Sequence, residues 1–118
     1  MRPERLYLSD IIEAADAIGN FVKGIEEAEF ISNDLIRSAV LQKLTVIGEA
    51  AARLSSDFCE HHPGVPWREI ADFRNIAVHA YFAVEWPIVW VAANEETPTL
   101  RGQVAEILAR EFPDASSA

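Results

Sequence analysis

The amino-acid sequence predicts an all-α protein, a bundle of about five helices. Apolar residues recur at spacings of three and four over long segments, and nowhere do apolar and polar residues alternate over a strand-length segment. Proline-containing breaks separate these segments. The 118 residues suit one domain with a single modest core. We therefore expect one helical domain over residues 1–118, with a frayed tail at 113–118.

The first two predicted helices are the longest. One covers residues 8–25, and Gly24 marks its end. The other runs from about residue 34 to residue 58, behind the capping cluster at 32–34. Gly48 lies inside this second helix, where glycine costs about 1 kcal/mol relative to alanine. A close approach of another helix at Gly48 would explain its presence.

Three further helices are predicted to begin at prolines. Pro66 serves as the first residue of a helix that continues to about residue 80. Pro87 opens a fourth helical segment in the same way. Thr97-Pro98 then interrupts the chain and starts the last helix, whose apolar face ends at Phe112.

The charge distribution restricts the kind of nucleic-acid contact that the chain can make. The net charge is −9, which argues against non-specific binding because phosphate contacts supply much of that affinity. The acidity lies mainly in the flanks, whereas residues 31–82 carry five basic and six acidic groups. A local basic pocket in this central segment is compatible with the sequence, and a broad basic face is not.

Cysteine content and hydropathy indicate a cytoplasmic protein. The single cysteine, Cys59, excludes an internal disulfide and fits a reducing compartment. No apolar segment reaches the roughly 18–20 residues that a membrane span requires, and the N-terminus does not read as a signal peptide. We expect no membrane contact.

The residues best suited to chemistry lie between positions 74 and 81. Arg74, Asn75, His79 and Tyr81 occur there among small apolar residues. Cleavage of a phosphodiester needs a group of near-neutral pKa to move protons and a cation to hold the phosphate, and His79 and Arg74 are of these types. Asn75 precedes His79 by four positions, so on a helix its amide can reach the imidazole or a bound phosphate.

Helical geometry separates the two candidate catalytic residues. Arg74 and His79 are five positions apart, about 140° around a straight helix, whereas Arg74 and Tyr81 lie on nearly one face. For Arg74 and His79 to address one phosphate, the helix must loosen near His79, or a second subunit must complete the site. We favour a twofold homodimer that places two copies of the motif face to face across a shared cleft.

Alternative interpretations of the polar residues also stand. Taken alone, Arg74 is typical of a solvated or ion-paired arginine, and His79 is typical of a histidine that caps a helix end. His61 and His62, with Cys59, have the composition of metal ligands, but adjacent histidines in a proline-bounded loop are typically solvated turn residues, and we expect no metal and no cofactor. Three tryptophans could stack on bases: Trp67, Trp86 and Trp90. Trp86 and Trp90, four positions apart on one helical face, are more typical of core or dimer contacts.

Several blocks of the chain together resemble the HepT-like members of the HEPN superfamily. The resemblance extends from Arg5-Leu6-Tyr7-Leu8 to Ile107-Leu108 and includes Ile47-Gly48-Glu49-Ala50-Ala51 and Pro66-Trp67-Arg68-Glu69-Ile70. The family motif is an arginine, four to six residues, a histidine, one residue and a tyrosine. Arg74, His79 and Tyr81 match it with a spacer of four, and Asn75 supplies the usual polar residue after the arginine.

The resemblance implies an HEPN-like bundle and a toxin of a toxin–antitoxin system. Such proteins are homodimeric, metal-independent endoribonucleases with the motif at the dimer cleft. Arg74 would hold the scissile phosphate of the RNA, His79 would transfer protons during attack by the ribose 2′-hydroxyl, and Asn75 would orient either group. A minimal nucleotidyltransferase antitoxin would neutralise the toxin by AMPylating Tyr81. The alternatives are a non-catalytic HEPN module that binds nucleotide or docks a nucleotidyltransferase, and a purely structural helical dimer.

Overall fold

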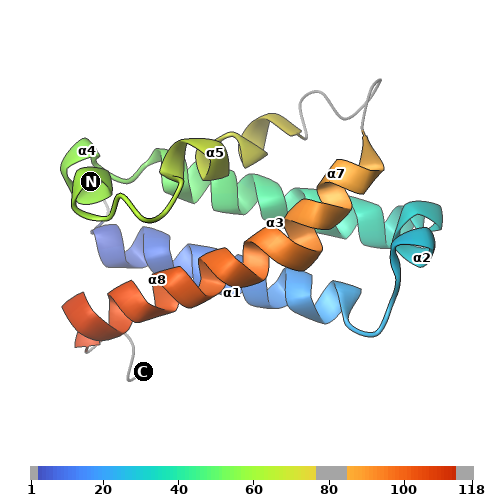
Figure 1. Ribbon diagram of the computed structural model, residues 1–118, viewed down its shortest axis with the longest axis horizontal. Coiled ribbons are helices and arrows are strands. Elements are labelled where there is room, and N and C mark those ends of the chain that lie inside the picture. Colours follow the sequence, from blue (N-terminus) through green and yellow to red (C-terminus); the bar gives the residue numbers. More distant parts are fainter. Residues whose placement is uncertain (1–2, 77–84, 114–118) are drawn as a thin grey trace.

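Three long helices form the body of the molecule, an all-α bundle (Figure 1). The computed structural model describes residues 3–76 and 85–113. Helix α1 (Glu4–Val22) packs mainly against α3 (Asp34–Ala52) and α8 (Thr97–Glu111). Short helices connect them: α2 (Glu27–Ser32), α4 (Ser56–His61), α5 (Trp67–Ala71), α7 (Trp86–Val91) and the π-helical turn η1 (Ala92–Glu96). No β-strand occurs within these described ranges.

The predicted apolar faces of α1, α3 and α8 form the core. Their fully buried side chains are Leu8, Ile11, Ile18, Val40, Leu44, Ile47, Leu100 and Val104. Burying each such side chain contributes roughly 1.5–3 kcal/mol, so this interior stabilises helices whose own propensity is modest. Nowhere in the described chain is a helix both long enough and apolar enough to cross a membrane.

The predicted boundaries of the first helix are partly confirmed. It begins at Glu4, four residues earlier than expected, and ends at Val22. Gly24 follows with a φ of 76°, a conformation that glycine adopts without steric cost, and so terminates the helix as predicted. Helix α2 was not predicted. It forms where the acidic segment 26–29 leads into Phe30, which is fully buried against Trp90 with ring centroids 5.3 Å apart.

The prediction of one helix over residues 34–58 is wrong at its C-terminal end. The Asn33 side chain caps α3 by accepting a hydrogen bond from the Ile36 amide at 3.0 Å, as the capping cluster indicated. The helix then ends at Ala52, and Ser55 caps the separate helix α4 by accepting from the Phe58 amide at 3.1 Å. A local serine cap therefore outweighs the apolar periodicity that continues through this break.

The expected interruption at Thr97-Pro98 does not occur. Glu96 and Thr97 keep helical backbone angles, so α7, η1 and α8 form one continuous helical segment. Proline normally breaks a helix because it lacks an N–H and because its ring meets the carbonyl four residues earlier. The π-helical turn at 92–96 changes the hydrogen-bond register just before Pro98, which accommodates the ring within the helix.

Candidate functional site

Arg74 and Asn75 lie on a helical turn at residues 73–76 that follows α5. Asp72 is the C-cap of α5, and the backbone N–H of Asn75 donates a hydrogen bond to the Asp72 carbonyl at 2.9 Å. Phe73 is buried and Ile76 is half-buried, and these two side chains anchor the turn to the core. Arg74 and Asn75 are exposed to solvent between them. The predicted helix over residues 66–80 is therefore confirmed only as α5, with Pro66 as its N-cap, and this turn, because residues 77–80 lie outside the described ranges.

The turn at residues 73–76 packs against Gly48 of α3 at very close range. A Cβ atom at this position would overlap the backbone nitrogen of Arg74 and would lie 3.0 Å from the Ala71 carbonyl oxygen. Only glycine allows the backbone after α5 to lie this near α3. The predicted close approach at Gly48 is confirmed. Its partner is the backbone of Arg74, the candidate phosphate-binding residue.

The Arg74 side chain is available to an anion. Within residues 3–76 and 85–113, no carboxylate pairs with its guanidinium group. His79 and Tyr81, the other two motif residues, lie outside the described residues, as does the expected frayed tail after Pro113. The meeting of Arg74 and His79 at one phosphate, and the homodimer that would achieve it, remain predictions.

Comparison with known proteins identifies the family. The model of the family "Ribonuclease HepT-like" matches residues 11–107, which include the whole segment from Arg74 to Tyr81. The chain belongs to the HepT-like ribonuclease family.

Three relatives match over nearly their full length. "Putative RNase MJ1380" of Methanocaldococcus jannaschii is 39% identical over 103 residues, 87% of this chain and 94% of that protein. "Putative RNase TTE0752" of Caldanaerobacter subterraneus subsp. tengcongensis is 38% identical over 94% of this chain and 99% of its own length. "Probable ribonuclease HepT" of Thermococcus cleftensis is 36% identical over 90% of this chain and 96% of its own length. No solved structure matches the chain significantly.

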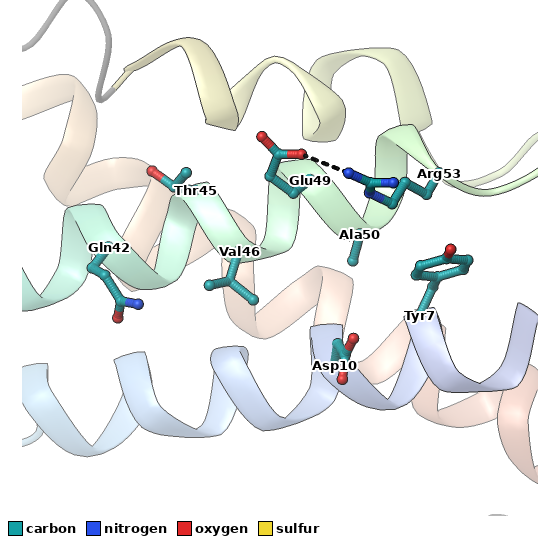
Figure 2. Close-up of a pocket in the computed structure, with 8 residues that line it drawn as sticks. All are labelled: Tyr7, Asp10, Gln42, Thr45, Val46, Glu49, Ala50 and Arg53. Atoms are coloured by element: carbon teal, nitrogen blue, oxygen red, sulfur yellow. Dashed lines mark ion pairs between the residues drawn. The ribbon is translucent and has the colours of Figure 1, made fainter. Parts of the chain in front are cut away.

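A groove of about 440 Å³ lies between α1 and α3 of this HepT-like chain (Figure 2). Its lining residues are Tyr7, Asp10, Gln42, Thr45, Val46, Glu49, Ala50 and Arg53. Glu49 directly follows Gly48 and pairs with Arg53 at 3.9 Å. The carboxylates of Asp10 and Glu49 outnumber the single guanidinium of Arg53, so the groove is unsuited to a phosphate. Arg74 is the better anion site.

The candidate metal ligands at the end of α4 have structural explanations. The His62 side chain is only 9% exposed, and its Nε2 atom lies 2.9 Å from a Glu111 carboxylate oxygen. The interpretation of His62 as a solvated turn residue is therefore wrong, because this histidine links α4 to the end of α8. Burial, with a smaller contribution from the Glu4 carboxylate, raises the pKa of the Cys59 thiol. Cys59 is thus protonated at neutral pH and is a poor metal ligand or nucleophile.

The tryptophans are mostly core residues of the HepT-like fold. Trp67 is buried and donates its indole N–H to the His62 carbonyl at 3.0 Å, and Trp90 is buried against Phe30. These contacts exclude both as base-stacking platforms and confirm the interpretation of Trp90 as a core residue. Trp86 is half-buried, and the Arg37 guanidinium lies over its ring, 4.6 Å from the centroid. The sequence did not predict the contact between Arg37 and Trp86. The only signal in the sequence is that positions 37 and 48 fall on one face of α3.

Proposed function

We propose that this chain is the toxin of a toxin–antitoxin system, a metal-independent cytoplasmic endoribonuclease whose site lies at the cleft of a homodimer. The observation that carries this proposal is the family match across residues 11–107, which contains Arg74, His79 and Tyr81 at the family spacing. The exposed Arg74, which is held at Gly48 and has no carboxylate partner among the described residues, supports it, because a phosphate needs an accessible cation.

The reaction follows from the chemistry of these residues. His79 accepts the proton of a ribose 2′-hydroxyl, whose oxygen attacks the adjacent phosphorus. The bond from phosphorus to the 5′-oxygen breaks, and that oxygen takes a proton from the His79 imidazolium, which leaves a 2′,3′-cyclic phosphate on one product and a 5′-hydroxyl on the other. Arg74 neutralises the charge that develops on the phosphate oxygens, and Asn75 orients the imidazole or the phosphate. The RNA hydroxyl is the nucleophile, so no metal ion is needed.

The dimer is tested by mixing two inactive variants. If Arg74 of one subunit acts with His79 of the other, heterodimers of Arg74→Ala and His79→Ala chains contain one intact site. Mixing the two variants under conditions of subunit exchange should then restore part of the cleavage activity. Inactivity of an exchanged mixture, shown to contain heterodimers by native mass spectrometry, would place both residues of a site on one subunit.

Tyr81 is the proposed point of control by a minimal nucleotidyltransferase antitoxin. Transfer of AMP from ATP forms a bond between the Tyr81 oxygen and the α-phosphorus and releases pyrophosphate. The added phosphate group would repel RNA and occupy the site beside Arg74. Coexpression with the antitoxin should add AMP to wild-type protein but not to Tyr81→Phe, as measured by intact mass and peptide mapping. AMP on Tyr7 instead would contradict this assignment.

A non-catalytic module is the second candidate. The net charge of −9 and the carboxylates beside the α1/α3 groove favour it, because both oppose RNA binding. Such a module would bind a nucleotide or dock the nucleotidyltransferase and would not cut RNA. RNA cleavage by highly purified wild-type protein, absent from the His79→Ala variant prepared in parallel, excludes this candidate.

A further inference from the structure

A second arginine lies on the same face of α3 as the contact with Arg74. Positions 37 and 48 are 11 residues apart, which at 100° per residue brings them within about 20° of each other around the helix. Gly48 contacts the Arg74 backbone, and Arg37 contacts Trp86 at the beginning of α7. Figure 1 shows the turn after α5 and the start of α7 on the same side of α3.

The Arg37 side chain is oriented but its charge is only weakly balanced. Its guanidinium stacks on Trp86, and Nη2 donates a hydrogen bond to an Asp34 carboxylate oxygen at 3.0 Å. The Asp34 side chain is 91% exposed and the Arg37 side chain 23%, so water reaches this ion pair from the Asp34 side and weakens it. The Arg37 Nε atom is buried and has no hydrogen-bond partner among the described residues. An anion that replaces Asp34 would therefore meet a positioned guanidinium.

We propose that Arg37 holds a second phosphate of the RNA, next to the one at Arg74. This inference rests on the proposed ribonuclease function. The first described range ends at Ile76, two residues after Arg74, and the second begins at Glu85, next to the Trp86 that Arg37 contacts. At 1.5 Å per residue, positions 37 and 48 are about 16 Å apart along α3, a separation that suits two phosphates of one strand better than a single phosphate. Arg37 therefore contacts a flanking phosphate.

The other cations of α3 and its C-terminal cap do not share this placement. Lys43 and Arg53 each lie five positions from Gly48, about 140° around α3. Arg53 also pairs with Glu49 beside the acidic groove. Phosphate contacts away from the reacting bond position a nucleic acid without specifying its sequence. We therefore expect Arg37 to contribute to RNA affinity and register, so that its loss raises KM, whereas loss of Arg74 lowers kcat.

Binding of a fluorescent single-stranded RNA, measured by anisotropy over a range of salt concentrations, tests this role. The His79→Ala background keeps the RNA intact. Arg37→Gln should weaken binding and reduce the slope of log K against log salt by roughly 0.7, the value for one phosphate contact on a single strand. Asp34→Asn should tighten binding at least about threefold at low salt, because Arg37 loses its competing carboxylate. The double variant Asp34→Asn/Arg37→Gln should show no such gain.

A matched control separates this effect from general charge. Glu106→Gln removes the same charge and frees Arg110, with which Glu106 pairs at 3.3 Å on α8. Equal gains from Asp34→Asn and Glu106→Gln, or an unchanged salt slope for Arg37→Gln, would overturn the inference. Where Arg37→Gln does not fold, the gain of Asp34→Asn over Glu106→Gln still tests the role, because neither variant removes the contact of Arg37 with Trp86. If these effects on binding are seen but the protein with an intact His79 never cuts RNA, the ribonuclease proposal is refuted and the phosphate contact at Arg37 stands.

Discussion

Replacing His79 by alanine is expected to lower the rate of RNA cleavage by about 10²–10⁴-fold, the usual contribution of a general acid–base residue. Arg74→Ala is expected to lower kcat by about 10²–10³-fold, because it removes the cation that meets the developing phosphate charge. The two effects should be far from additive in the double variant, since both residues act on one transition state. Single-turnover cleavage of a defined RNA measures all three variants.

Arg110→Ala is the matched control for Arg74→Ala. It removes the same charge from an exposed arginine, and Arg110 lies near the end of α8, away from the turn at 73–76 (Figure 1). Its cleavage rate should equal that of the wild type. A loss as large as that of Arg74→Ala would show that the effect reflects overall charge and not phosphate binding at the motif.

Gly48→Ala is expected to reduce both stability and activity. The added methyl group would overlap the Arg74 backbone, and overpacking of this kind costs about 1–3 kcal/mol of unfolding free energy even though alanine favours the helix by about 1 kcal/mol. The turn must then move away from α3 and carry Arg74 with it. A displacement of about 1 Å at a catalytic group can cost about 100-fold in rate. Chemical denaturation and cleavage below the unfolding transition measure the two effects.

Gly102→Ala makes the same substitution where nothing obstructs it. No atom lies within 4 Å of a Cβ at Gly102, which is exposed on α8. This variant should gain up to about 1 kcal/mol of stability and keep the wild-type cleavage rate. A folded Gly48→Ala protein with full activity would mean that the contact at Gly48 does not set the position of Arg74.

Periodic apolar patterns predicted the long helices well because those helices bury a continuous stripe. The same pattern failed at the end of α3, where Leu54 and Phe58 keep the helical period although the Ser55 cap starts a new helix. Helix α2 escaped prediction because its six residues depend on burying Phe30 against α7, a tertiary contact. Pro98 was misinterpreted because sequence rules place proline at helix starts and do not anticipate a π-helical turn.

The candidate site was predictable to a similar degree. Gly48 signalled a close approach from its position inside a helix, although the sequence did not reveal that the partner would be Arg74. Arg37 gave no comparable signal, because its contact with Trp86 joins residues 49 positions apart in the chain. Side-chain placement of this kind depends on how α7 docks on the bundle, and no local spacing encodes it.

The most direct test of the ribonuclease assignment is the cleavage of one defined RNA, in the presence of EDTA, by wild-type protein and by the Arg74→Ala/His79→Ala variant purified side by side. The expected result is that only the wild type cuts, giving fragments with a 2′,3′-cyclic phosphate and a 5′-hydroxyl, identified by mass spectrometry. Cleavage that persists in the double variant, or a wild-type protein that leaves the RNA intact, would contradict it.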